Sequence, residues 1–142
     1  MALLLHQGNL SIVHVDLGQN KFSHSGFISI FEALANNSKL DSLDVSNQEG
    51  ANKNKINRKA FKSLRNMLEG QQKNGCISQI DFGNIGLGDE GIECIAEGIN
   101  GTRIRKLGLR NNQITSKGVQ FFVEIGFFNG DEMSPVLTPI KD

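Results

Sequence analysis

Acidic side chains recur at one position of a repeated pattern in this chain of 142 residues. Asp16, Asp44 and Asp81 each stand between two apolar residues of a short alternating stretch. Carboxylates in such a row can bind a basic group or a cation, and His14 close to Asp16 is a combination that suits acid–base chemistry. The spacing places no serine or cysteine nucleophile beside them and forms no compact calcium loop. We therefore expect a binding role, with no catalytic residue and no metal site.

Positive charge is concentrated in two further segments. The first contains Arg105, Lys106 and Arg110, with Asn111 beside them, and would place basic side chains next to the acidic ones. The second has no acidic residue and contains Lys53, Lys55, Arg58, Lys59, Lys62 and Arg65. Such a ridge could contact phosphates, but Phe61 is the one aromatic residue nearby and it fits the apolar core pattern. We expect a solvated loop or a contact for an acidic protein, and no bound nucleic acid.

A glycine-rich loop and two cysteines carry weaker signals. Residues 86–91 read GLGDEG, which formally matches the G-x-G-x-x-G pattern of dinucleotide sites. The equivalent positions in neighbouring copies of the repeated pattern keep only the last glycine, so we expect no cofactor. Cys76 and Cys94 lack metal-like spacing and are expected to be free thiols.

Bulk composition argues against several function classes. The 15 basic and 15 acidic residues balance, so no overall field draws the chain to nucleic acid or to an acidic membrane surface. No apolar run approaches the ~20 residues of a membrane span, and the apolar stretch at residues 1–5 is too short for a signal-peptide core. We expect a cytoplasmic protein without membrane contact.

Four copies of one pattern position the charged side chains. Apolar residues at relative positions 1, 4 and 6 alternate, which predicts a short strand in each copy. The copies begin at Ile12, Leu40, Ile77 and Ile104. Their offsets are 28, 37 and 27 residues, because the second copy holds an insertion at residues 48–55. The first strand is ambiguous, since Leu10 and Val13 could set its register instead.

A helix is predicted after each strand. Apolar residues recur at +1, +4, +5 and +8 from a small residue, which is usually glycine, and this is the spacing of a helical stripe. Polar residues just before these stripes are expected to cap the helices by accepting unpaired backbone N–H groups. These residues are Ser23 and Ser25, Asn57, Asp89, and Thr115 and Ser116.

The fourth copy, IRKLGLRNNQITSKG, resembles the L-x-x-L-x-L-x-x-N-x-I-x-x-x-G signature of leucine-rich repeats. The copy length and the full helix are similar to the ribonuclease-inhibitor-like subclass. The resemblance implies an α/β solenoid bent into a horseshoe arc, with a parallel sheet on the concave side and helices on the convex side. It implies one domain over residues 1–142. The repeats would cover about 10–39, 40–76, 77–103 and 104–129, with a C-terminal tail at 130–142.

The signature asparagine is kept in only two of the four repeats. Asn20 and Asn112 match it, whereas Gln48 and Ile85 occupy the same column in repeats two and three. A buried asparagine satisfies backbone groups in the bend after the strand. We therefore expect a rearranged bend in those two repeats, or a substitute from the preceding residue, which is an asparagine in both.

The resemblance implies a non-enzymatic protein–protein interaction module that binds its partner through the concave face. Its expected contact residues are Asp16, Asp41, Asp44, Asp81, Arg105, Lys106, Arg110 and Asn111, with Lys53, Lys55, Arg58 and Lys59 as a basic loop contact. Two alternatives stay open: a structural scaffold subunit or fragment of a larger assembly, and a regulator similar to GTPase activators. The concave side of four such strands would cover on the order of 450 Å², below the ~800 Å² per partner of a standard interface.

The ends of the repeat array are expected to need cover. Phe121, Phe122, Phe127 and Phe128 crowd the last repeat, and no fifth strand is expected after it. Either the C-terminal tail folds back over these rings or a second copy of the chain covers them. A homodimer through uncapped ends is therefore a further expectation.

Overall fold

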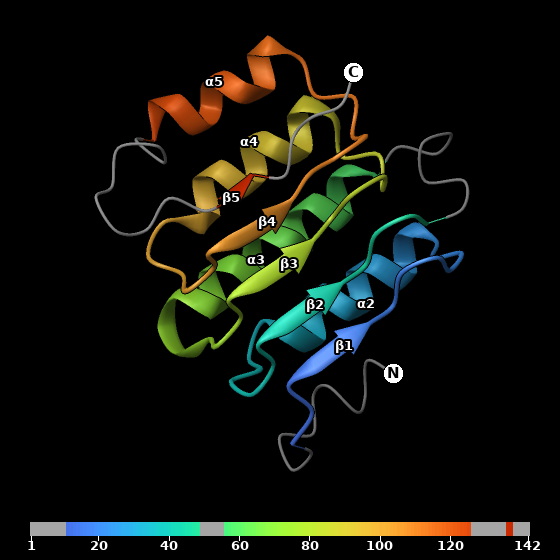
Figure 1. The fold of residues 1–142 in the computed structure, drawn as a ribbon, viewed down its shortest axis with the longest axis vertical. Coiled ribbons are helices and arrows are strands. Elements are labelled where there is room, and N and C mark those ends of the chain that lie inside the picture. The colour runs from blue at the N-terminus through green and yellow to red at the C-terminus, as the bar shows by residue number, and fades with distance from the viewer. Residues whose placement is uncertain (1–10, 49–55, 126–135, 138–142) are drawn as a thin grey trace.

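The protein is an α/β structure in which four short parallel strands alternate with four helices (Figure 1). The computed structural model describes residues 11–48, 56–125 and 136–137. The strands are β1 (His14–Asp16), β2 (Ser42–Asp44), β3 (Gln79–Asp81) and β4 (Lys106–Gly108). The helices are α2 (His24–Leu34), α3 (Arg58–Asn74), α4 (Gly88–Ile99) and α5 (Ser116–Glu124). No helix of the described ranges has the length and apolar character needed to cross a membrane.

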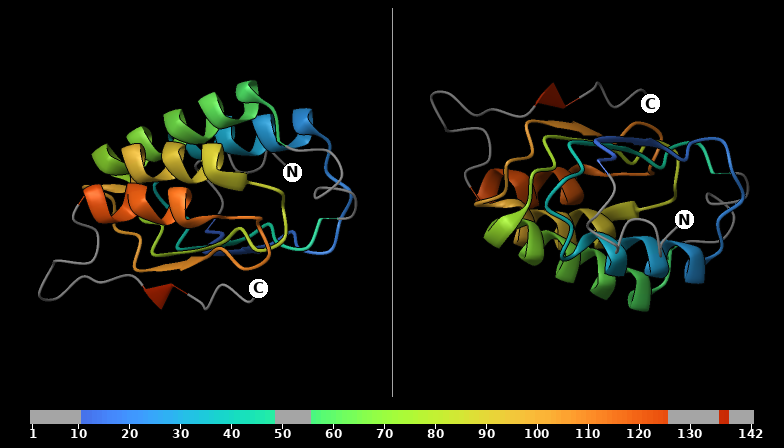
Figure 2. Two further views of the ribbon diagram at one scale, coloured as in Figure 1. Left: turned by 90° about the horizontal axis from the view of Figure 1, so that it is seen from above. Right: turned by 90° about the horizontal axis from the view of Figure 1, so that it is seen from below.

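The sheet has the strand order β1-β2-β3-β4-β5, and every neighbouring pair is parallel. The four helices of the described residues all cover the same face of the sheet, and none of them lies on the other face of β1 to β4 (Figure 2). We call this uncovered side the strand face. The fifth strand, β5 (Val136–Leu137), pairs with β4. The expectation that no strand follows the last repeat is therefore wrong, because the tail adds one to that edge.

The strand register matches the offsets read from the sequence. His14 pairs with Ser42, Ser42 with Gln79, and Gln79 with Lys106, which are separations of 28, 37 and 27 residues. The ambiguity in the first strand is settled, because Val15 pairs with Leu43 while Val13 is 48% exposed. The insertion lies between β2 and α3 and does not shift the pairing of the strands on either side.

The core fills the space between the sheet and the helices. Strand positions 1, 4 and 6 point into it, and α2, α3 and α4 contribute the apolar stripe predicted for them. The stripe prediction is wrong for α5, where Phe122 is buried but Val119 and Val123 are 38% and 58% exposed. The rings of Phe27, Phe31 and Phe82 are fully buried, and Phe31 meets Phe82 edge to face at 6.2 Å between centroids. Each helix packs mainly on the next one along the chain. One unit therefore buries its apolar surface against its neighbours, as a repeated strand–helix unit must.

Helix capping follows the sequence prediction at three of the four helices. Ser23, Asn57 and Thr115 each accept a hydrogen bond from a backbone N–H in the first turn of α2, α3 and α5. The prediction for Asp89 is wrong. Helix α4 begins after Leu87, which has no side-chain cap, and the Asp89 carboxylate instead accepts the Thr115 backbone N–H at 2.8 Å and its hydroxyl at 2.7 Å. Asp89 thus ties its own helix to the start of the next.

The contacts of Asp89 also perturb its ionisation. Partial burial on its own would raise the pKa of Asp89. Hydrogen bonds from the Thr115 side chain and backbone and from the Gly118 backbone, together with the charge of Lys117, act in the opposite direction and hold the pKa below its usual range. The ionised carboxylate is therefore the form that the folded protein favours.

A buried amide side chain joins the last two units. The Asn112 side chain is 1% exposed, and its Oδ1 accepts the three consecutive backbone N–H groups of residues 85–87 at 3.0 to 3.2 Å. Its Nδ2 donates to the carbonyl oxygens of Phe82 at 2.8 Å and Leu109 at 3.0 Å. One side chain thus satisfies the bend after β3 and holds it against the bend after β4.

Gln48 performs the same task between the first two units. Its Nε2 donates to the carbonyls of Leu17 at 2.8 Å and Val45 at 3.1 Å, and its Oε1 accepts the Phe22 N–H at 3.2 Å. The expected substitution by Asn47 is therefore wrong, since Gln48 itself reaches the backbone of the preceding unit. Ile85 is fully buried and brings no amide. An amide at this position would bond to the bend after β2, and that is where the insertion at residues 48–55 lies in the sequence.

Candidate binding site on the strand face

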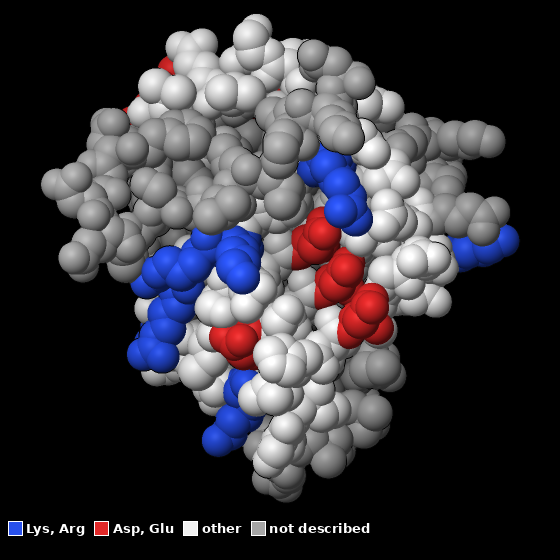
Figure 3. All heavy atoms as spheres, in the orientation of Figure 1, with Lys and Arg blue, Asp and Glu red and all other residues white. Residues whose placement is uncertain are grey.

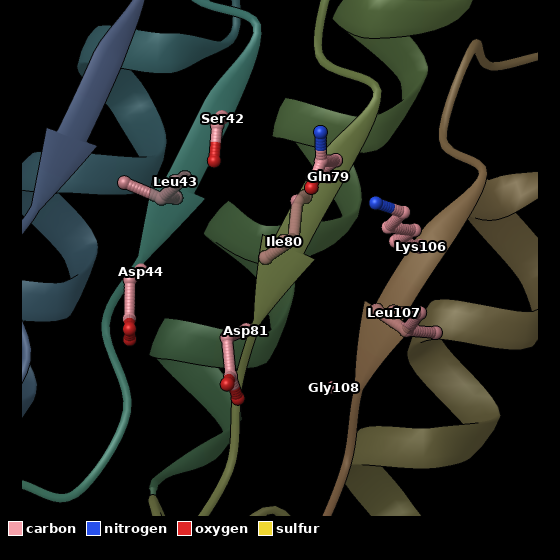
Figure 4. Close-up of a pocket in the computed structure, with 9 residues that line it drawn as sticks. All are labelled: Ser42, Leu43, Asp44, Gln79, Ile80, Asp81, Lys106, Leu107 and Gly108. Carbon is pink, nitrogen blue, oxygen red and sulfur yellow. The ribbon is translucent and has the colours of Figure 1, made fainter. Parts of the chain in front are cut away.

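The strand face contains a hollow of about 260 Å³ over β2, β3 and β4. Its lining consists of Ser42, Leu43, Asp44, Gln79, Ile80, Asp81, Lys106, Leu107 and Gly108. In Figure 4 the Asp44 and Asp81 carboxylates lie side by side, and Ser42, Gln79 and Lys106 form a second row. Gly108 pairs with Asp81 and therefore continues the line of Asp44 and Asp81 onto β4, but it has no side chain. The hollow is thus floored by buried apolar residues and bordered by polar ones.

The three aspartates predicted as a group do lie together. Asp16 pairs with Asp44 and Asp44 with Asp81, so they form one line across β1, β2 and β3, which we call the acidic row. Acidic side chains form this line in Figure 3, with basic side chains at its upper end. Like charges directly opposite each other on a sheet are destabilising. The row therefore needs local support from other contacts.

That support is the same at each aspartate. One carboxylate oxygen accepts the backbone N–H two residues further along the chain: Gly18 at 2.8 Å from Asp16, Ser46 at 2.7 Å from Asp44, and Gly83 at 2.7 Å from Asp81. These bonds fix the carboxylates at the point where each strand turns away. Asp16 and Asp44 form no ion pair with another residue of the described ranges.

Arg110 reaches back from the fourth unit to the acidic row. Its Nη2 lies 3.6 Å from Asp81 Oδ2, and both side chains are partly exposed. Two glycines make room for this contact. A Cβ on Gly83 would come within 2.8 Å of the Arg110 side chain, and a Cβ on Gly108 would come within 2.5 Å of Asp81 Oδ1. Sequence reasoning assigned Arg110 to a separate basic group, whereas the structure places its guanidinium beside a carboxylate.

The remaining predicted contact residues have different roles. Asp41 lies outside the acidic row and accepts the Ser78 hydroxyl at 2.6 Å. Arg105 is half-buried and donates to carbonyls of its own turn, whereas Lys106 is exposed on β4. Asn111 has a φ of 54°, in the left-handed region, and the same column holds this conformation in all four units. Asn111 therefore shapes the bend, as the matching residues Gln19, Asn47 and Asn84 do.

Only part of the predicted basic loop belongs to the described residues. Lys53 and Lys55 lie outside the described residues. Arg58 and Lys59 are exposed at the start of α3, in the helix layer and away from the strand face. The ridge is also less basic than its sequence implies, because Arg65 forms ion pairs with Glu69 at 3.1 Å and Glu97 at 2.8 Å.

The described residues were also compared with three other kinds of site: a dinucleotide loop, a metal site and a nucleophilic thiol. The N–H groups of residues 85–88 donate to the Asn112 side chain and carbonyl, so this part of the glycine loop is occupied by the protein itself. No group of three His, Cys, Asp or Glu side chains in the described part of the chain could hold a metal ion. Cys94 is buried, which raises the pKa of its thiol to about 11 and opposes nucleophilic chemistry.

Sequence reasoning did not include Ser42 and Gln79 among the contact residues, although both line the hollow. They pair in register with Lys106. That shared column was the signal available in the sequence. A site built from whole columns, rather than from charged residues alone, would have included them.

Comparison with models of known protein families gives no match to this chain, and comparison with curated proteins gives none either. The fold and the site define the class in structural terms: a parallel α/β protein built of repeated strand–helix units, with a polar sheet face that none of the described helices covers.

Proposed function

We propose that the chain is a leucine-rich-repeat protein of the ribonuclease-inhibitor-like type, and that it binds a protein partner through its strand face. The repeat register of the strands and the helix layer on one side support the first part. The buried amides of Gln48 and Asn112 support it further, because they bridge successive bends from the column of the signature asparagine.

The observation that carries the binding role is the acidic row beside the hollow. A sheet face that serves only as solvated surface has no need of aligned like charges, which weaken the pairing of strands. Here three carboxylates are aligned and each is held in place by a backbone N–H. Lys106 lies on β4, at the other side of the same hollow. Opposite charges on the two sides would orient a partner that carries the complementary pattern.

The size of the face limits how tightly it binds alone. A patch on the order of 450 Å² corresponds to roughly half of the ~800 Å² per partner in a standard interface. The partner would therefore also contact loops at the rim of the sheet, or the binding would be weak and transient.

Affinity capture with matched variants tests this proposal. One variant carries Asp44→Asn, Asp81→Asn and Lys106→Gln, which remove strand-face charge while asparagine keeps an oxygen for the backbone N–H. The control carries Glu32→Gln, Glu93→Gln and Lys62→Gln, which make the same charge changes on exposed helix residues. We expect a partner retained by the wild type and the control and lost by the strand-face variant. Equal capture by both variants would favour a scaffold role.

A further inference from the structure

We infer that the acidic row binds a protein segment that presents arginine side chains, and that Arg110 is an internal competitor for one place in that row. This inference rests on the proposed function, since it names the chemistry of the partner. It starts from the one guanidinium that already contacts the row: Arg110, 3.6 Å from Asp81 Oδ2.

The Arg110–Asp81 pair indicates what kind of group the row accepts. Both side chains stay partly exposed, at 44% and 30%, so neither charge has to be fully removed from water. The guanidinium lies over Gly83, where a side chain on that residue would displace it. Gly108 gives the Asp81 carboxylate the space that a side chain on β4 would fill. The face therefore has room for a planar cation beside the row.

Asp16 and Asp44 are two further carboxylates of the row, and neither forms an ion pair with Arg110. They share the strand position of Asp81 and the same bond to a backbone N–H two residues on. Neighbouring strands lie ~4.8 Å apart, and side chains one turn apart on a helix lie ~5 to 6 Å apart. Two arginines on one face of a short segment can therefore meet both carboxylates together. A phosphate-bearing partner would instead be repelled by them.

Arg110 lowers the affinity of the row for such a segment in two ways. It neutralises Asp81, and its own positive charge repels an incoming cation within the ~8 Å Debye length of physiological salt. Removing the charge of Arg110 should therefore strengthen binding, whereas removing the charge of Asp44 should weaken it. Opposite signs from two residues of one surface distinguish this arrangement from a general loss of structure.

The backbone amides of Gly18, Ser46 and Gly83 provide direct reporters, because each donates to a carboxylate of the row. The ¹⁵N-labelled full chain is titrated with an eight-residue peptide of alternating arginine and serine and followed by amide chemical shifts. We expect saturable shifts at Gly18 and Ser46 and a smaller shift at Gly83. A peptide of alternating glutamate and serine should leave these three amides unmoved.

Variants supply the quantitative test. Asp44→Asn should weaken binding of the arginine peptide roughly two- to fivefold, the range of a single exposed ion pair. Arg110→Gln should strengthen binding by a similar factor and increase the shift at Gly83 to the size of those at Gly18 and Ser46. Glu93→Gln on α4 removes the same charge from the helix layer and should leave the affinity unchanged. If Arg110→Gln binds the arginine peptide with unchanged or weaker affinity, the competitor role is wrong. If the amide signals of Gly18 and Ser46 do not shift during the titration, the arginine site is wrong.

These results separate the present inference from the proposed function. If the strand-face variant loses its captured partner but the arginine peptide does not bind, the face is a docking surface and the arginine chemistry is wrong. If the peptide binds as described but capture ignores the strand-face changes, the arginine site stands and the proposed docking role fails.

Discussion

Replacing Asn112 by alanine should strongly destabilise the protein, because its side chain bridges two buried bends. The side chain makes five hydrogen bonds of 3.2 Å or less to buried backbone groups: three N–H donors at residues 85–87 and the carbonyls of Phe82 and Leu109. At a net ~1 kcal/mol for each bond, and with some groups recovered by water, the loss comes to about 4 kcal/mol. Domains of this size are typically stable by ~5 to 15 kcal/mol.

Asn20 provides the matched control, because it stands in the same column and is exposed. Its Nδ2 donates to the Leu17 and Gly18 carbonyls of its own bend, and water can replace both bonds. Asn20→Ala should therefore cost about 0.5 kcal/mol. Urea unfolding followed by far-ultraviolet circular dichroism suits this chain, which has no tryptophan or tyrosine. A loss below about 1 kcal/mol for Asn112→Ala, or similar losses for the two variants, would refute the bridging role.

Three further predictions concern the helix layer. Asp89→Asn should lower the free energy of unfolding at neutral pH by about 1 kcal/mol, because it weakens the hydrogen bonds to Thr115. Because the folded pKa of Asp89 is depressed, this difference should be present above ~pH 4 and vanish as pH falls through the folded value in acid urea titrations. Cys94 should resist iodoacetamide at pH 8 until the chain unfolds, whereas Cys76 should be labelled first, as mass spectrometry of the peptides would show. Gly70→Ala should cost about 1 to 3 kcal/mol in thermal unfolding, because its Cβ would overlap the carbonyl of Ala35 at the end of α2; Asn66→Ala, exposed on the same helix, is the control.

The order of elements and the strand register were predictable from spacing alone. Apolar residues at fixed relative positions can only form one continuous core if the strands pair in step, so Val15, Leu43, Ile80 and Leu107 had to align. The same reasoning could not predict β5. Its two paired residues, Val136 and Leu137, belong to a segment with no copy of the repeated pattern and no helical stripe after it.

The sequence predicted which charged residues belong to the candidate site, but it did not predict the contacts between them. The acidic row follows from its column, whereas the Arg110–Asp81 pair depends on two glycines whose empty space has no signature in the spacing. Gln48 shows a second limit. Its type departs from asparagine, yet one extra methylene still lets its amide reach Leu17. The need for an amide in that column could be read from the sequence, but the ability of a longer side chain to supply it could not.

The bond from each row aspartate to the backbone two residues on has an evolutionary consequence. Asparagine offers the same oxygen to that N–H and carries no charge, so one nucleotide change can switch the charge of a unit while its bend is kept. Mutational drift at Asp16, Asp44 and Asp81 should therefore run mostly between these two residue types. Selection for a different partner can act on the strand face one unit at a time, because the charge and the local fold are separable at these positions.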